Sequence, residues 1–360
     1  MNAQLTILSP VHIGNGKTIS PVEYEINHDK YAKIDMNAFF QDSSADMNQY
    51  YTAIEDYKNY GKFPFQFQKK HYQYTTPVGE YVDDEIIGKE IRSFMKTTGN
   101  VYIPGSTIKG ALRTAMLYNV LKNDTNQYQK AVTILQQQIS QRYANPSQVA
   151  AAIEKQVFGD TTHDFFKALQ ISDTQPMSPE DVLTLQIIDI LSSTSSNKMY
   201  TKFSLLAECL KQHTTFLFNW KTDNYYFSSA AKELGFSDKK ELLTETSSIC
   251  NDYADELIDY EYNFFKRFGD QFQDMLDFYE DLIDLRYADN FNGFLLRLGY
   301  GSGWQTMTMG RLFEDEPLFQ KLRQKFRLGK RGIDLFPKSR RIIADKKDYP
   351  FGWVHVQVES

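Results

Sequence analysis

VYIPGSTIKGALRTAM, residues 101–116, is the stretch of this chain that carries most information about its fold. The β-branched and aromatic run at its start predicts a short strand, which Pro104-Gly105 ends. Ser106 is then a candidate helix N-cap, and the apolar residues after it recur with helical spacing. Residues 101–122 therefore predict a strand, a glycine turn and a helix.

The start of this predicted helix has the ingredients of an anion site. Lys109 and Arg113 stand four residues apart, so both project from the same side of the first turns. The backbone N–H groups of Gly105, Ser106 and Thr107, together with the helix dipole, favour a phosphate. The spacing GxxxxGK[ST] of a nucleotide-triphosphate loop is absent. Two interpretations stay open, a phosphate site and an ordinary strand-to-helix turn with solvated cations.

Length and composition narrow the class of protein. The 360 residues predict two domains, or at most three, and 41% hydrophobic with 14% aromatic residues is enough for a packed core. Cys209 and Cys250 lie far apart, which argues against a zinc site or a disulfide framework and fits a reducing cytoplasm. Neither a signal peptide nor an apolar run of membrane-spanning length is present, so we expect a soluble, cytoplasmic protein without a membrane partner.

Charge is unevenly distributed along the chain. The net charge is −6, yet residues 252–289 hold twelve acids against three bases, and residues 321–347 hold eleven bases against two acids. A concentrated basic segment can attract phosphates even in an acidic protein. The alternative is that the acidic and basic segments pair with each other.

Strands and helices intermix with long intervening pieces, which predicts an α+β fold rather than a regularly alternating parallel sheet. We expect two units, residues 1–215 and 216–360. The Ser/Thr-rich piece around residues 192–206, with Lys198 and Lys202, predicts a projecting β-hairpin. Apolar residues at spacings of three and four predict one long helix over 248–286, with its acids on the opposite face.

Three glycine-bearing loops lie near cations or aromatic residues and predict a shared nucleic-acid groove. They are PGSTIKG at 104–110, HIGNGK at 12–17 with His12, Gly14, Gly16 and Lys17, and GYGSG at 299–303 with Gly299, Gly301 and Gly303. Near the C-terminus, Lys338, Arg340 and Arg341 form a basic run. Guanidinium groups suit phosphate oxygens particularly well.

Catalytic signals are weak. His12 is the only histidine in a plausible groove and could serve as the general base of an RNA-cleaving enzyme, although a structural or RNA-contacting role is commoner for such a residue. The other histidines show no metal-ligand spacing, and HExxH is absent, so neither a metal nor another cofactor is expected. Asp173 is better explained as a strand-end turn former or a buried hydrogen-bond acceptor than as a catalyst.

Several motifs together resemble the RAMP superfamily of CRISPR interference complexes. They are SPVHIGNG at 9–16, YIPGSTIKGALRTAM at 102–116, VFGD at 157–160 with LQISDTQP at 169–176, LGYGSGW at 298–304, and FPKSRR at 336–341 with a final GW strand. PGSxxKGxxR is specific to the superfamily. The flanking SPVHIG and FPxSRR are most similar to the family of the fifth Csm subunit of type III-A systems.

The resemblance implies an RNA-binding subunit with two ferredoxin-like (RRM-like) domains rather than a free-standing enzyme. Such subunits lie at the end of the filament near the 3′ end of the CRISPR RNA (crRNA) and support its maturation, with trimming by recruited cellular nucleases. The implied partners are crRNA, target RNA, the backbone RAMP subunit and the small subunit. The predicted hairpin resembles the thumb that such subunits insert across the guide–target duplex.

Three functions remain open at this stage. The favoured one is a non-catalytic guide-RNA carrier that reads phosphate and sugar, with its acidic helix turned away from RNA. The second is a metal-independent endoribonuclease that uses His12 as its base. The third is a scaffold whose glycine loops pack against neighbouring proteins.

Overall fold

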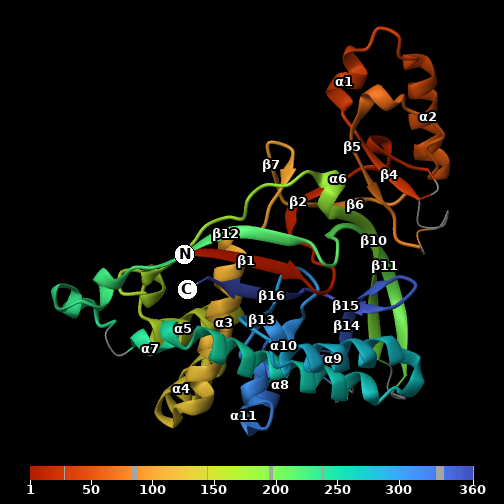
Figure 1. Cartoon of the computed structure of the whole chain (residues 1–360). Helices are drawn as coiled ribbons and strands as arrows, with labels where there is room; N and C mark the ends of the chain where they lie inside the picture. Colours follow the sequence, from red (N-terminus) through yellow and green to blue (C-terminus); the bar gives the residue numbers. More distant parts are fainter. Residues whose placement is uncertain are drawn as a thin grey trace.

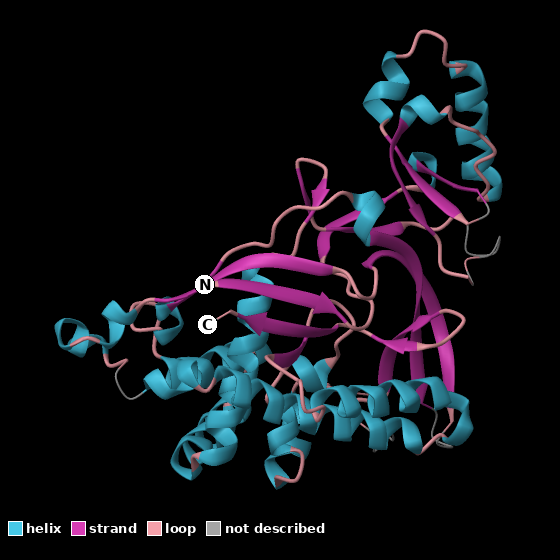
Figure 2. Ribbon diagram, viewed as in Figure 1, coloured by secondary structure: helices cyan, strands magenta, loops and turns pink. Residues whose placement is uncertain are grey.

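The computed structural model describes residues 1–27, 29–80, 82, 88–143, 145–193, 198–236, 239–329 and 336–359. Two large sheets and a layer of helices form its body (Figures 1 and 2). The first sheet is antiparallel throughout and has the strand order β13 (Phe294–Arg297), β16 (Trp353–Val358), β1 (Asn2–Ile7), β12 (Thr215–Thr222) and β9 (Leu169–Ile171). The α+β class is therefore as predicted.

The second sheet has six strands, of which only β11 and β6 run parallel. Its order is β15 (Tyr349–Pro350), β14 (Ser339–Ala344), β10 (Leu183–Ser193), β11 (Met199–Leu210), β6 (Ile91–Phe94) and β2 (Gly14–Ile19). Both sheets combine strands from the two sides of residue 215. The predicted units 1–215 and 216–360 therefore share both sheets through hydrogen-bonded strand pairs.

Helices lie along one side of the first sheet, below it in Figure 1. They are α3 (Gly105–Asn123), α4 (Thr125–Ser140), α5 (Pro146–Phe158), α8 (Thr246–Lys266), α9 (Gln273–Arg286), α10 (Trp304–Met307) and α11 (Pro317–Lys325), with the shorter α7 (Lys240–Thr244). The short helix α6 (Pro179–Val182) lies above the first sheet in the same view. Leu5 of β1, Leu112 of α3 and Leu257 of α8 belong to the same buried core. No helix among the described residues is both long and apolar enough to cross a membrane.

The prediction of a single helix over 248–286 is wrong, because the helix is interrupted. The chain forms two helices, α8 and α9, separated by a 3-10 turn at Gly269–Phe272. Gly269 has φ +65°, a left-handed conformation that cannot continue an α-helix. The apolar spacing runs through this break because the residues on both sides of it enter the same core.

A lobe projects from the body at the upper right of Figure 1. It contains the three-stranded sheet β3 (Tyr24–Asn27), β4 (Lys30–Ile34) and β5 (Tyr72–Pro77), with helices α1 (Met36–Gln41) and α2 (Met47–Tyr60). Phe39, Tyr50, Phe65 and Phe67 form its separate aromatic core. The chain then returns through the short ribbon β7 (Lys96–Thr97) and β8 (Asn100–Val101) into α3.

Strands β10 and β11 form the antiparallel pair expected around residues 192–206, with a register shift after Ile190. Residues 194–197, the connection between the two strands, lie outside the described residues. The assignment of this hairpin as a thumb stays a prediction.

Candidate nucleic-acid interface

Helix α3 begins one residue earlier than its predicted N-cap. Pro104 occupies the N-cap position and makes no side-chain cap, while Ser106 lies inside the first turn. The cap comes instead from the end of β9, where the carboxylate of Asp173 accepts a hydrogen bond from the N–H of Gly105 at 2.8 Å. The prediction of Ser106 as the N-cap is wrong because a segment distant in sequence supplies the acceptor. Asp173 accepts a hydrogen bond as predicted, but the expectation that it is buried is wrong, because the turn after β9 leaves its side chain exposed.

Close packing explains the glycine at this position. A Cβ on Gly105 would lie 2.4 Å from the carbonyl oxygen of Ile171 and 2.6 Å from that of Ser172. Any side chain would therefore push α3 away from the strand that caps it. The PGS turn is thus required by helix–strand packing, whatever ligand it binds.

Both cations of the predicted phosphate site have partners within the chain. The ammonium group of Lys109 donates to the carbonyl oxygen of Leu169 at 2.6 Å, and its burial lowers the pKa of Lys109. Arg113 pairs with Glu154 at 2.7 Å and with Asp164 at 2.8 Å. These contacts stabilise the fold, and two carboxylates already compensate the charge of Arg113.

An open polar cavity of about 690 Å³ lies beside this helix start. Ser106, Lys109 and Arg113 line it together with Lys155 and Lys167 of the neighbouring segment. Thr107 is half-buried next to them. Asp173 already bonds the N-terminus of α3, and two carboxylates already pair with Arg113. The phosphate site at 105–113 therefore stays a prediction.

The loops at 12–17 and 299–303 lie side by side, as expected for a shared groove. The N–H of Tyr300 donates to the carbonyl oxygen of His12 at 2.8 Å. Gly299 has φ +76°, and a Cβ there would approach the same oxygen to 2.5 Å. The loop at 104–110 packs instead against residues 171–173.

His12 is buried between these loops, with 2% of its surface exposed. Its Nδ1 lies 2.7 Å from the carbonyl oxygen of Glu208, and its ring meets Phe94 and Tyr300 edge to face. Burial lowers the pKa of His12 and so favours the neutral imidazole. These contacts fit a residue that joins two loops and two strands.

Two arginines lie over the ring of Tyr300. The guanidinium carbon of Arg92 lies 4.8 Å from the ring centroid and that of Arg341 lies 5.1 Å from it. The Nε of Arg341 also donates to the tyrosine hydroxyl at 3.3 Å. Within the described part of the chain, neither arginine forms an ion pair with a carboxylate. Neither guanidinium charge is therefore paired with a carboxylate of the described residues.

This cluster, Arg92, Tyr300 and Arg341, comes from three distant parts of the sequence. Thr18 of β2 pairs with Arg92 of β6, and Ile190 of β10 pairs with Arg341 of β14. The sequence interpretation included Arg341 but missed Arg92 and Tyr300. The glycines around Tyr300 were a usable signal for the tyrosine, whereas Arg92 carries no local motif and needed the sheet topology.

The remaining predicted residues divide into exposed and buried groups. Gly14, Gly16 and Lys17 are exposed on or beside β2, Lys198 and Lys202 are exposed near the start of β11, and Gly301, Gly303 and Lys338 are less accessible. Lys202 lies over the ring of the half-exposed Phe203 at 6.0 Å. A cationic and aromatic surface on β11 is suited to nucleic acid.

Arg340 differs from its neighbour Arg341. It is 4% exposed, pairs with Glu261 of α8 at 2.9 Å and lies 3.6 Å above the ring of Phe264. At this residue the alternative interpretation holds, since the basic segment pairs with the acidic helix. In this structure Arg340 does not present its guanidinium to a ligand because the strand alternation of β14 directs it into the core.

No group of three or more potential metal-ligating side chains occurs among the described residues.

The chain belongs to the RAMP superfamily, whose family model matches residues 4–305. Among curated relatives, a CRISPR system Cms protein Csm5 from Methanocaldococcus jannaschii is 23% identical over 91% of this chain and 78% of its own length. A Csm5 from Mycobacterium tuberculosis is 22% identical over 52% of this chain and 57% of its own length.

Solved structures agree with this family. One is a chain of a Csm–crRNA–target RNA ternary complex of a type III-A CRISPR-Cas system, with a TM-score of 0.74, 22% identity and coverage of 99% of this chain and 100% of that one. The other is a Csm5 from T. onnurineus, with a TM-score of 0.68, 21% identity and coverage of 98% and 99%. The resemblance to the fifth Csm subunit, indicated by the motifs, is confirmed by these comparisons.

Proposed function

We propose that this chain is the non-catalytic crRNA-binding subunit of a type III-A (Csm) interference complex that acts in antiviral defence in the cytoplasm. Its partners would be crRNA, target RNA, the backbone RAMP subunit and the small subunit. Family membership and the similarity to Csm5 proteins support this assignment.

The cluster of Arg92, Tyr300 and Arg341 is the observation that carries the RNA-binding part of the proposal. Two guanidinium groups, neither of which has a carboxylate partner among the described residues, lie over an aromatic ring at the junction of the 12–17 and 299–303 loops. Guanidinium groups bind phosphate oxygens in a bidentate manner, and a base of any kind can stack on a guanidinium plane. Recognition through phosphate, sugar and stacking tolerates any guide sequence, as a guide carrier requires.

The finer parts of the proposal concern position and maturation. We place the subunit at the end of the filament near the crRNA 3′ end, where it would support 3′-end maturation by recruited nucleases. Lys198 and Lys202 on the β10–β11 hairpin would then face the guide–target duplex. Arg340, the neighbour of Arg341 on β14, pairs with Glu261 of α8, and we infer that the acidic helices α8 and α9 face away from the RNA.

The salt dependence of RNA binding tests the proposal. In filter-binding or anisotropy titrations of the full chain with single-stranded crRNA, the double variant Arg92→Ala/Arg341→Ala should bind more weakly. Its log Kobs against log salt should be shallower by about 0.7 for each lost phosphate contact. Arg142→Ala is the matched control, because Arg142 is exposed and lies 5.4 Å over Tyr143 in the same kind of pair. An unchanged slope would remove the cluster from the interface.

The same titration tests whether the α3 site binds a phosphate. Lys109→Ala/Arg113→Ala should also reduce the slope if that cavity holds a phosphate. A loss of stability without a change of slope would assign both residues to the fold alone.

The alternative, a metal-independent endoribonuclease with His12 as base, has a separate test. Purified protein is incubated with repeat RNA in EDTA, and products are resolved on a denaturing gel. Burial of His12 and its contact with the Glu208 carbonyl lead us to expect no specific cleavage. Specific cleavage that His12→Ala abolishes would favour the enzyme.

A further inference from the structure

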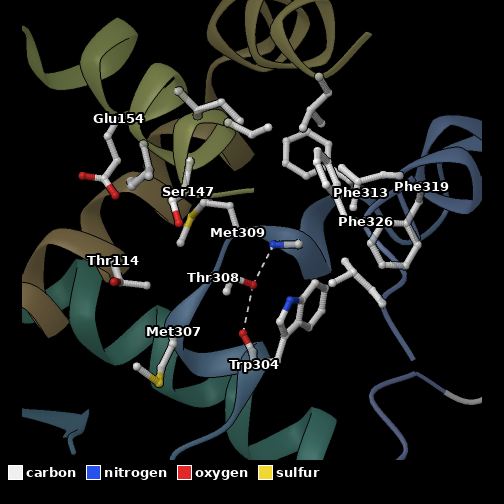
Figure 3. A pocket seen from close by; sticks show the side chains of 18 of the residues that line it. Thr114, Ser147, Glu154, Trp304, Met307, Thr308, Met309, Phe313, Phe319 and Phe326 are labelled. Carbon is white, nitrogen blue, oxygen red and sulfur yellow. Dashed lines mark hydrogen bonds between the residues drawn. The ribbon is translucent and has the colours of Figure 1, made fainter. Parts of the chain in front are cut away.

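A second surface, separate from the arginine–tyrosine cluster, contains an open apolar cavity of about 400 Å³ (Figure 3). Helices α3, α4 and α5 form one wall, and the segment from α10 through α11 forms the other. Its lining is dominated by aliphatic, aromatic and methionine side chains, among them Leu117, Ile153, Trp304, Met309, Phe319 and Leu322. A cavity of this size and lining is typical of a site that receives apolar groups.

The apolar surface extends to the outside of the molecule. Met307 lines the cavity and is 65% exposed. Phe326 and Leu328 continue the lining beyond the end of α11 and are only partly buried. Methionine adapts its shape to an incoming group, and covering exposed apolar area lowers the free energy. The cavity therefore favours an apolar partner surface over water.

Its polar groups are few and largely satisfied. The hydroxyl of Thr308 donates to the carbonyl oxygen of Trp304 at 2.9 Å and accepts from the N–H of Gly310 at 3.2 Å (Figure 3). Glu154, the acidic residue in the lining, is paired with Arg113. A nucleobase would find few free edges to bond here. The lining therefore suits the apolar side chains of a protein better than RNA.

Charge beside the cavity selects the kind of protein. Residues 317–329, which form α11 and the turn after it, contain no acid and carry Lys321, Lys325 and Arg327, besides Arg323, which lies over the ring of Phe336. The acids Glu314, Asp315 and Glu316 precede the helix, so the positive charge is concentrated toward its C-terminal end. Lys325 also donates to the carbonyl oxygen of Gln141 and so ties α11 to the end of α4. One flank of an apolar cavity is thus cationic, which complements an anionic partner.

We propose that this cavity binds an acidic amphipathic helix of a neighbouring protein. Apolar residues of that helix, spaced three and four apart, would enter the cavity between α5 and α11. Its acidic residues would lie against the cations of α11. This interface would leave the RNA-binding cluster free, so the two functions can be tested separately.

Two synthetic peptides serve as probes with the full-length protein. Both are labelled 16-residue helices with leucine at positions i, i+3, i+4 and i+7, and the polar positions are glutamate in one and lysine in the other. Fluorescence anisotropy should show binding of the glutamate peptide and at least about tenfold weaker binding of the lysine peptide. Met307→Asp should weaken binding of the glutamate peptide by about tenfold or more, because it places a charge at the apolar opening.

Matched variants separate this effect from misfolding. Leu217→Asp changes an exposed leucine on β12, outside the cavity, and should leave peptide binding unchanged. Lys321→Glu/Lys325→Glu should reverse the preference between the peptides, and this reversal tests the proposal even if Met307→Asp fails to fold. Absence of glutamate-peptide binding, or binding that Met307→Asp does not affect, would overturn it. Loss of crRNA binding in Met307→Asp, with peptide binding absent, would assign the cavity to RNA instead.

Discussion

The carboxylate of Asp173 lies 2.8 Å from the backbone nitrogen of Gly105 and closes the N-terminus of α3. An acidic residue of the chain itself therefore occupies the helix terminus where the sequence predicts an external phosphate. The positive end of a helix dipole is neutralised equally well by a carboxylate and by a phosphate. The arginine–tyrosine cluster, whose cations have no such partner within the described residues, is thus the better candidate for RNA.

Removing this cap should cost stability but not RNA affinity. Asp173→Ala leaves the Gly105 N–H without its acceptor, and we expect the free energy of unfolding to fall by about 1 kcal/mol. Urea denaturation followed by circular dichroism measures the change. RNA affinity should stay the same or rise because an anion has been removed. A clear loss of affinity at unchanged stability would show that Asp173 contacts RNA.

Two glycines of the same helix should respond oppositely to alanine. Gly105→Ala places a methyl group against the carbonyls of Ile171 and Ser172 and should destabilise the chain by about 1–3 kcal/mol. Gly110→Ala meets open space and should stabilise the helix by up to about 1 kcal/mol. Thermal unfolding of the two variants provides the comparison. Equal effects would mean that the α3–β9 approach is looser than it is here.

Of the two neighbouring arginines on β14, one should contribute mainly to stability and the other mainly to RNA binding. Arg340→Ala leaves Glu261 buried without its cation and should lower the free energy of unfolding by about 3–5 kcal/mol. Arg341→Ala should change stability little and weaken RNA binding. Chemical denaturation measures the free energy of unfolding of each variant, and RNA titration measures the affinity of each for RNA. Similar stability losses in the two would contradict the assignment of Arg340 to the core.

A buried carboxylate should couple the projecting lobe to the second sheet. Glu208 of β11 is fully buried and accepts hydrogen bonds from the hydroxyl of Tyr74 and from the N–H of Phe94, while pairing with Lys96 at 2.5 Å. Glu208→Gln should destabilise the chain by about 3 kcal/mol because Lys96 loses its counter-charge.

Lys96→Met provides the double-mutant cycle for this pair. The two changes together should cost less than the sum of the single costs. Additive costs would show that the ion pair contributes nothing to stability.

Asp348 gives the stability a defined pH dependence. Burial, followed by the nearby carboxylate of Asp274, raises the pKa of Asp348 to about 6. The folded state therefore binds this proton more tightly than the unfolded state, and stability falls as the pH rises from about 4 to about 6. Asp348→Asn should raise the unfolding free energy at pH 8 by on the order of 1 kcal/mol, after allowance for solvent screening. Thermal melts at pH 8 and below pH 4 check this, since the difference should vanish at the lower pH.

Local patterns were sufficient for much of the fold. The helix after the glycine turn at 104–105, the α+β class and the β10–β11 strand pair all follow from periodicity and turn residues that act over short distances. The strand predicted before that turn is shorter than expected, since β8 ends at Val101. The single helix over 248–286 was wrong because apolar spacing reports which residues enter the core and does not report a break at Gly269 that preserves this face.

Contacts between distant segments were beyond reach of the sequence. Asp173 caps a helix that begins 68 residues before it, and Arg92 meets Tyr300 only because β6 and the 299–303 loop adjoin the same glycine loop. No local signal distinguishes Arg340 from Arg341, yet one is buried against Glu261 and the other lies on Tyr300.

The sequence alone determined the family and the glycine loops, because close backbone packing and motif spacing are written in adjacent residues. The tertiary structure decided which cations are available. A charge is most available to a ligand where folding has left it without an internal carboxylate, and that depends on strands and helices far apart in the chain.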